Sequence, residues 1–239
     1  MPILPLSIFD DLAGNFYATF IEKDRYMLFL QGLGNTLLIT LFATLLGIAI
    51  GLVVAIIKVY CAQTGRLKIA NAVCTAYVAV IRGTPMVLQL LIMYYLVFAA
   101  FPDEMTLLIA ILSFGINSGA YVSEIVRGGI LAVDRGQLEA GRSLGLTQGQ
   151  TMKSIILPQA VKSILPALGN EFITLLKETS IVGYITIVDL TRAGDIVRSR
   201  TFDAFFSLIS VAVVYFILVM GISWLLKKAE RRLAKSDRR

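Results

Sequence analysis

The chain of 239 residues is 57% hydrophobic and only 16% charged, and its mean hydropathy is +0.79. These values exclude an ordinary soluble protein and predict a single all-α transmembrane domain over residues 1–239. Most of the formal net charge of +6 lies in the tail 227–239. Because a basic segment directly after an apolar run is a cytoplasmic topogenic signal, we expect the tail in the cytoplasm and not on nucleic acid.

The missing residue types exclude most enzyme chemistry. Histidine is absent, which removes the HExxH zinc motif, Ser–His nucleophiles and most haem ligation. The two cysteines, Cys61 and Cys74, predict neither a disulfide framework nor a CxxC site. An intramembrane aspartyl protease needs paired aspartates within spans, whereas every aspartate here lies at a terminus or in an expected loop. We therefore expect a non-enzyme with no catalytic site, no metal and no cofactor.

Residues 1–26 mix charged and aromatic side chains, which indicates a short surface or interfacial segment. The first apolar run, 28–57, is long enough to cross a bilayer, and its Gly47 and Gly51 favour close helix packing. A basic connector follows, with Lys58, Arg66 and Lys68. By the positive-inside rule this connector is cytoplasmic, which places the N-terminus outside. Since no basic region precedes the first apolar residues, we expect no cleaved signal peptide.

The second apolar run, 69–101, is too long for one straight span. In its middle, the sequence RGTP at 82–85 joins a flexible glycine to a proline that lacks the backbone N–H. We therefore expect a kink or a break there. The third run, 105–130, is apolar enough for one further span.

The fourth run, 155–177, is the least apolar, because it contains Pro158, Lys162, Pro166, Asn170 and Glu171. Unpaired polar groups in hydrocarbon cost several kcal/mol, so this span is expected to face protein or water. Residues 177–203 carry mixed charge and are expected outside, with the apolar part 181–190 in the membrane interface. The last run, 204–226, leads to the basic tail. Five spans with the N-terminus outside and the C-terminus in the cytoplasm satisfy the positive-inside rule.

Polar residues recur at helical spacing on one face of the second, third and fourth spans. An ionisable residue within a span indicates either a transport pathway or a buried ion pair. The first alternative predicts a hydrophilic cavity lined by Arg82, Thr84, Gln89, Asn117, Tyr121, Glu124, Asn170 and Glu171. The second makes the three ionisable members of this set structural ions that hold the helices in register.

Such a cavity suits a zwitterionic amino acid. Arg82 can bind the carboxylate, and Glu124 or Glu171 can bind the ammonium group or a cationic side chain. The two carboxylates favour a cationic amino acid as the substrate.

The segment 136–154 is the one long polar insert between the apolar runs, and its pattern predicts a helix, a turn and the start of a second helix. With its continuation to Pro158, it resembles the EAA loop of permease subunits in binding-protein-dependent ABC importers. The sequences at 82–89, 119–130 and 165–180 resemble the polar amino-acid branch of that family. The third EAA position, usually alanine, is Gly141 here, which we expect to soften the first coupling turn by about 1 kcal/mol.

This resemblance implies a type I ABC importer permease fold in the bacterial inner membrane, with short coupling helices seated in a groove of a cytoplasmic ATPase. The residues that it assigns to coupling are Glu139, Ala140, Gly141, Gly145, Leu157 and Pro158. It also implies two ATPase subunits, a second permease subunit that is identical or different, and an extracytoplasmic substrate-binding protein. The chain contains no GxxxxGK[ST] phosphate loop, so ATP would be bound by another chain.

The predicted function is the transmembrane subunit of an ATP-driven importer for a polar or basic amino acid. One alternative is an ABC importer permease for another small solute. A second, from a different class, is a secondary amino-acid transporter or channel that uses the same cavity. The coupling loop argues against the second alternative, because such a protein needs no surface for an ATPase.

Overall fold

The structure is a computed structural model that describes residues 13–235, with side chains described through Arg231. Within this range the chain is helical and contains no strand. The elements in chain order are η1 (Tyr17–Ile21), η2 (Glu22–Asp24), α2 (Tyr26–Thr64), α3 (Lys68–Gly83), α4 (Met86–Ile92), η3 (Met93–Val97), η4 (Asp103–Met105), α5 (Thr106–Leu131), α6 (Arg135–Ser143), α7 (Gln148–Thr151), η5 (Met152–Ile156), α8 (Leu157–Glu178), η6 (Thr179–Ile185), α9 (Leu190–Thr201) and α10 (Ala204–Lys235).

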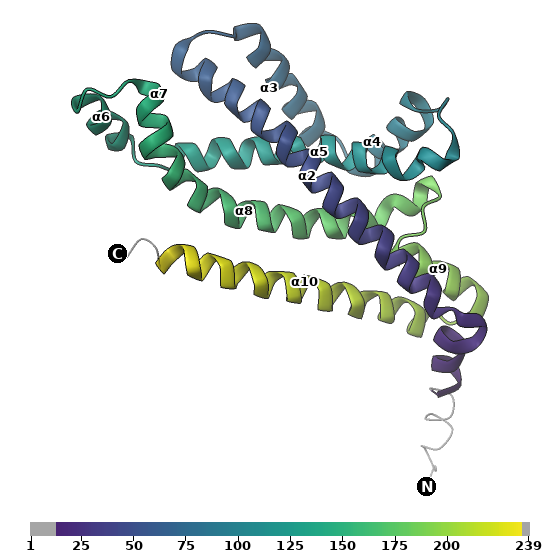
Figure 1. The fold of residues 1–239 in the computed structure, drawn as a ribbon. Helices are drawn as coiled ribbons and strands as arrows, with labels where there is room; N and C mark the ends of the chain where they lie inside the picture. The colour runs from purple at the N-terminus through teal and green to yellow at the C-terminus, as the bar shows by residue number, and fades with distance from the viewer. Residues whose placement is uncertain (1–12, 236–239) are drawn as a thin grey trace.

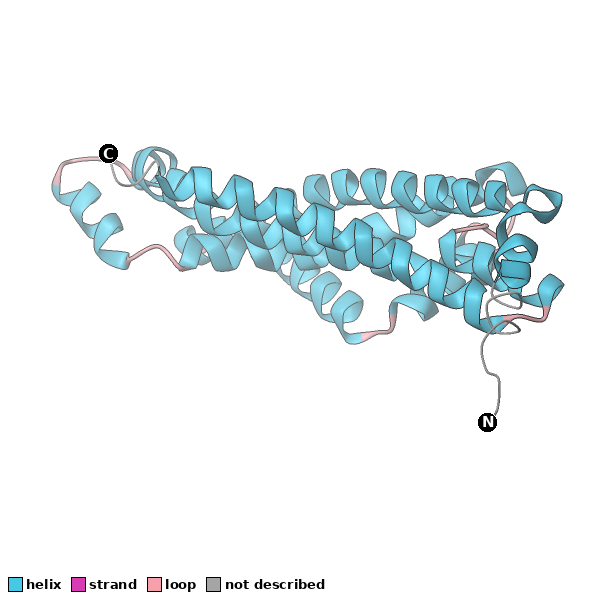
Figure 2. Ribbon diagram, turned by 90° about the horizontal axis from the view of Figure 1, so that it is seen from below, coloured by secondary structure: helices cyan, strands magenta, loops and turns pink. Residues whose placement is uncertain are grey.

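The long helices form an elongated bundle with two distinct ends. Helices α6 and α7 lie at the same end as the C-terminal end of α10, whereas α9 and the start of α2 lie at the opposite end (Figure 1). The view in Figure 2, turned by 90°, shows the same separation along the length of the bundle. From residue 13 onward the predicted surface segment 1–26 forms short helical turns that are interrupted at Lys23 and Asp24, which have positive φ, and its first part, 1–12, lies outside the described residues.

Small residues bring α2 against α5 at the centre of the bundle. A Cβ added to Gly47 would lie 2.8 Å from the Cβ of Ser118, and one added to Gly51 would lie 2.5 Å from Val122 Cγ1. Contacts this short leave no room for a side chain, so the two backbones approach closely only because these positions are glycine. The close packing predicted for this glycine pair is confirmed.

Helices α2 and α10 and the segment Asp103–Leu131 are long and apolar enough to cross a membrane. The pair of Lys68–Gly83 and Met86–Val97 also qualifies when taken together, as one span bent by 110°. Helix α8 covers the fourth predicted span, but polar residues interrupt its apolar sequence, and it is not among the qualifying helices of the described range. The count of five spans therefore stays a prediction.

The predicted break in the second run is confirmed. Helix α3 ends at Gly83, Thr84 is extended, and α4 begins at Met86 after Pro85. Proline has no N–H to continue the helical hydrogen bonds, and it disfavours the helical conformation in the residue before it. The 110° bend carries α4 across toward α5.

Half of the segment 181–190 is buried in the protein core, whereas Tyr184 and Thr186 are exposed, and its expected position in the membrane interface stays a prediction. Val182, Ile185 and Leu190 have exposed fractions of 0%. Helix α2 holds this segment through polar contacts: Asn35 Nδ2 donates to Val188 O at 2.9 Å. The sequence pattern showed that 181–190 is apolar, but a buried segment and an interfacial one have the same composition.

Helix α10 continues past the predicted end of the last span at residue 226 and through Lys235. The residues after Trp224 are mostly leucine, lysine, alanine, glutamate and arginine, which are strong helix formers. The basic tail is therefore a helical extension of the span in its described part.

Candidate functional site

The side-chain amide of Gln89 satisfies backbone and side-chain acceptors at the break between α3 and α4. The carbonyl of Ile81 would normally accept a hydrogen bond from the residue four positions later, but that residue is Pro85. Gln89 Nε2 donates to Ile81 O at 2.7 Å and to Thr84 Oγ1 at 2.7 Å. The Gln89 side chain thus replaces the missing backbone donor and holds Thr84, the extended residue at the bend, in place.

The same amide ties the broken helix to α5. Gln89 Oε1 accepts a hydrogen bond from Asn117 Nδ2 at 2.9 Å, and Asn117 is 3% exposed. The network of Thr84, Gln89 and Asn117 therefore joins three of the predicted pathway residues across two elements. Because buried amides need partners on both the donor and the acceptor side, this network specifies one arrangement of the bend.

Arg82 and Tyr121 meet beside this network. The Arg82 guanidinium lies over the Tyr121 ring, with its central carbon 5.2 Å from the ring centroid. Arg82 is exposed, and in the described part of the chain it makes no ion pair. A guanidinium held by an aromatic face but not neutralised by a carboxylate can bind an anionic group.

Glu124 is engaged by two basic residues. Its carboxylate pairs with Lys58 Nζ at 2.6 Å and with Arg127 Nη2 at 2.6 Å. The side chains of Lys58 and Glu124 are only 15% and 17% exposed. A partly buried carboxylate within a span requires such compensation, so the structural ion-pair alternative describes the contacts of Glu124.

Glu171 and Asn170 belong to α8 and not to the hydrogen-bond network around Gln89. Glu171 Oε1 accepts a hydrogen bond from Ser118 Oγ at 2.8 Å, which links α8 to α5. Asn170 is its neighbour in sequence but projects from another side of α8 and is exposed. The eight predicted residues therefore divide into one cluster of five at the helix break, the paired Glu124, and two residues on α8.

Sequence reasoning missed three residues that contact this set: Lys58, Ser118 and Arg127. Lys58 was assigned to the connector, because a lysine after an apolar run is normally a topogenic signal. The spacing of Glu124 and Arg127, three residues apart on one helix, was the available signal for the ion pair. Nothing in the sequence indicated that Lys58 lies beside Glu124, since the two are 66 positions apart.

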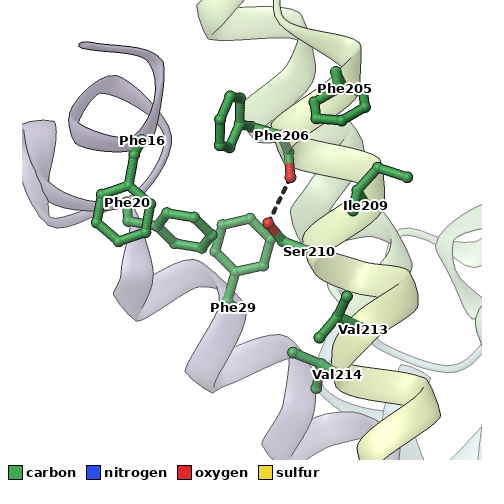
Figure 3. A pocket seen from close by; sticks show the side chains of 9 residues that line it. All are labelled: Phe16, Phe20, Phe29, Phe205, Phe206, Ile209, Ser210, Val213 and Val214. Atoms are coloured by element: carbon green, nitrogen blue, oxygen red, sulfur yellow. Dashed lines mark hydrogen bonds between the residues drawn. The ribbon is translucent and has the colours of Figure 1, made fainter. Parts of the chain in front are cut away.

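A cavity of about 400 Å³ lies elsewhere, between the N-terminal segment and α10. Figure 3 shows that aromatic rings from both elements line it, and that its one hydroxyl, on Ser210, already donates to the carbonyl of Phe206. A space without available polar groups does not suit a zwitterionic solute. This apolar cavity is therefore separate from the candidate pathway.

The loop between α5 and α8 forms two short helices with well-defined ends. The side chain of Asp134 accepts from the backbone N–H of Gly136 at the start of α6, and Thr147 and Gln150 form a capping box at α7. Between them Gly145 has a φ of +81°, and the backbone N–H of Leu146 donates to Gly141 O at 3.0 Å. This is a Schellman turn, for which glycine is the preferred residue. The predicted order of helix, turn and second helix is confirmed.

Gly141 packs directly against the second short helix. A Cβ at this position would lie 2.5 Å from Thr151 Cγ2 and 2.7 Å from Thr151 Oγ1. Glycine at the third EAA position therefore permits α6 and α7 to pack closely. This packing role is separate from the loss of helix stability expected from the low helix propensity of glycine. The residue is buried, whereas its neighbours Glu139 and Ala140 are exposed.

Apolar groups are also exposed on this loop and at the start of α8. Leu144 is 79% exposed and Leu157 is 38% exposed, and Pro158 beside it is also exposed. A closely packed pair of helices with protruding apolar side chains has the features of a docking surface.

Comparison with known proteins identifies the family. The profile of the binding-protein-dependent transport system inner membrane component matches residues 47–235. The chain belongs to this family. The permease is 39% identical to the glutamine transport system permease protein GlnP of Escherichia coli strain K12, over 81% of this chain and 89% of GlnP.

The fold of the permease also matches solved structures. It superposes on a chain of an amino acid ABC transporter crystallised with histidines, with a TM-score of 0.80 and 43% identity, over 89% of this chain and 98% of that one. A chain of the inward-facing MetNI methionine ABC transporter gives a TM-score of 0.75 at 23% identity, over 87% of this chain and 96% of that one, and that likeness concerns the fold alone. The predicted all-α importer permease fold is confirmed.

Proposed function

We propose that this permease forms the translocation pathway of an ATP-driven importer for a polar or basic amino acid. The observation that carries the proposal is the cluster of Arg82, Gln89, Asn117 and Tyr121 at a broken helix. The relatives support the substrate class, since their names refer to glutamine transport and to an amino acid ABC transporter with histidines. The pathway residues remain those predicted: Arg82, Thr84, Gln89, Asn117, Tyr121, Glu124, Asn170 and Glu171.

Within this pathway the residues have different tasks. Arg82 binds the substrate carboxylate, because its guanidinium is exposed and stacks on Tyr121. Glu171 is the better partner for an ammonium group, because Glu124 already has two cationic partners. Gln89 acts indirectly, by holding the bend that presents Arg82.

Coupling occurs through α6 and α7. The exposed surface around Glu139, Ala140 and Leu144, together with Leu157 and Pro158, docks on a cytoplasmic ATPase subunit that hydrolyses ATP. Gly141 and Gly145 keep this surface rigid, because they allow the close packing and the turn. The complex comprises two ATPases and two permeases around a shared pathway.

The opposite end of the bundle faces the substrate-binding protein. Helix α9 presents Arg192, Asp195 and Arg198 as an exposed charged surface there, and Arg198 and Arg192 lower the pKa of the Asp195 carboxyl. In this topology the N-terminus is outside and the C-terminus is in the cytoplasm of a bacterial cell, consistent with α6, α7 and the C-terminal end of α10 sharing one end of the bundle.

The proposal is tested by uptake into proteoliposomes that contain the permease, its ATPase and its binding protein. Arg82→Ala should lower ATP-driven uptake about 10-fold or more, because a hydrogen bond to a charged group contributes about 1.5–3 kcal/mol. Arg66→Ala, which removes an exposed arginine at the α2–α3 connection, should leave uptake unchanged. Uptake that runs on an ion gradient without ATP or the ATPase would overturn the importer assignment.

A further inference from the structure

The C-terminal part of α10 carries an aromatic and basic stripe on one face. Trp224, Lys227, Lys228 and Arg231 occupy positions i, i+3, i+4 and i+7 of the helix. At 3.6 residues per turn these positions lie on one side. All four residues are exposed, and Lys228 Nζ lies 5.1 Å from the centroid of the Trp224 ring.

Packing against α8 turns this stripe away from the bundle. A Cβ added to Gly169 of α8 would lie 2.5 Å from Leu226 Cδ2, so Leu226 faces α8 in direct contact. Leu226 is two residues after Trp224, which is about 200° around the helix. The contact therefore fixes the rotation of α10 with the stripe on the side that points away from α8.

The stripe combines an aromatic ring with cations, and these match the apolar boundary and the negative phosphates of a lipid head-group region. Tryptophan is enriched at membrane boundaries, where its ring lies among glycerol and acyl groups and its N–H reaches polar atoms. The three cations follow within two turns, and Glu230, the acidic residue among them, lies about 120° away from Trp224 around the helix.

We propose that the stripe of Trp224, Lys227, Lys228 and Arg231 binds anionic phospholipid head groups of the cytoplasmic leaflet and anchors α10 there. Trp224 marks the membrane boundary, and the three cations contact the lipid phosphates. This inference rests on the proposed topology, in which α10 emerges into the cytoplasm. Each basic residue near an anionic surface strengthens attraction to it about fivefold. Three cations on one face thus give a marked preference for anionic over zwitterionic lipid.

Trp224 is the only tryptophan in the chain, so its fluorescence reports on this site alone. The full chain is reconstituted in phosphatidylcholine vesicles that contain phosphatidylglycerol in both leaflets. Either the phosphatidylglycerol or an equal mole fraction of the phosphatidylcholine is brominated, since brominated acyl chains quench only nearby tryptophan. Brominated phosphatidylglycerol should quench Trp224 more strongly. The difference should shrink when salt rises from about 0.1 M to about 1 M, where the Debye length falls from about 10 Å to about 3 Å.

A variant with Lys227→Gln, Lys228→Gln and Arg231→Gln should lose the difference between the two lipids while Trp224 stays in place. A charge-matched control with Arg66→Gln, Lys68→Gln and Lys153→Gln removes three exposed cations from other elements and should keep it. Equal quenching by the two lipids in the unmodified chain, or an unchanged difference in the first variant, would overturn the proposal. The measurement uses neither ATP nor substrate and both leaflets are alike, so its failure would leave the transport function and topology standing.

Discussion

At the scale of single residues, Gln89 and Gly141 position the elements that carry the candidate pathway and the candidate docking surface. Gln89 supplies the donor that Pro85 cannot, and it receives a hydrogen bond from Asn117 in return. Gly141 leaves the space into which Thr151 packs. Both residues act by positioning others, and both effects depend on groups a few ångströms away that are not adjacent in the sequence.

The first prediction concerns Gln89→Leu. The substitution replaces the amide with an apolar side chain of similar size and leaves Ile81 O and the Asn117 amide without their partners. Each unsatisfied buried group costs about 1–3 kcal/mol, so we expect a lower unfolding temperature and reduced uptake. Thermal unfolding in detergent measures the first effect. Gln63→Leu, at an exposed position of α2, is the control, and equal stability of the two variants would contradict the capping role.

The second prediction concerns Gly141→Ala. The added methyl group would lie 2.5 Å from Thr151 Cγ2, and such overpacking costs about 1–3 kcal/mol. We expect normal membrane insertion but weaker stimulation of the ATPase by substrate, because α6 and α7 separate. Adding Thr151→Ala should restore part of the stimulation.

Gly149→Ala serves as its matched control. A Cβ at Gly149 meets no described atom within 4 Å, and the residue lies in the adjacent short helix. If both alanine variants reduced stimulation equally, helix propensity and not the contact with Thr151 would explain the effect.

At the scale of elements, α2 and α5 form the frame to which the other helices attach. Glycine and serine contacts set their separation at the centre, and the ion pair of Lys58 on α2 with Glu124 on α5 sets their register nearer the loop between α5 and α8. The bent pair α3–α4 is then fastened to α5 by the amide network. Because α5 is held in place by α2, its hydrogen bond to Gln89 can hold the bend of the second span in one position within an otherwise apolar bundle.

The third prediction tests this frame through Gly51→Ala. The new Cβ would lie 2.5 Å from Val122 Cγ1, so α2 must move away from α5. We expect a loss of about 1–3 kcal/mol of stability, seen as a lower unfolding temperature in detergent. Gly34→Ala on the same helix, where a Cβ meets no described atom within 4 Å, should be neutral or slightly stabilising. A neutral result at Gly51 would show that the interface adapts.

At the scale of the whole molecule, the two ends of the bundle have different surfaces. One end carries α6, α7 and the basic extension of α10, and the other carries α9 and the capped turn that precedes it. The candidate pathway residues lie on the helices that join these ends. Movement of the coupling end can reach the pathway through α5 and α8, which leave the loop directly and are linked by Ser118 and Glu171.

The fourth prediction concerns charge reversal at the coupling end. Glu139→Lys should leave insertion intact but abolish most of the stimulation of ATP hydrolysis by substrate, because the exposed carboxylate belongs to the proposed docking surface. ATPase assays of the reconstituted complex measure this. Glu104→Lys, an exposed reversal in η4 outside the coupling loop, should keep the coupling. Normal stimulation in Glu139→Lys would contradict the docking role.

The sequence by itself determined the properties that depend on local order along the chain. Apolar runs predicted the membrane helices, RGTP predicted the break, and the spacing around Gly145 predicted the helical hairpin, because each signal acts through backbone geometry within a few residues. The tertiary structure alone decided that Glu124 pairs with Lys58, that Gln89 caps Ile81 and contacts Asn117, and that half of 181–190 is buried. Except for the cap on Ile81, those outcomes depend on which helix faces which, and that choice follows from glycine contacts between distant positions such as Gly51 and Val122.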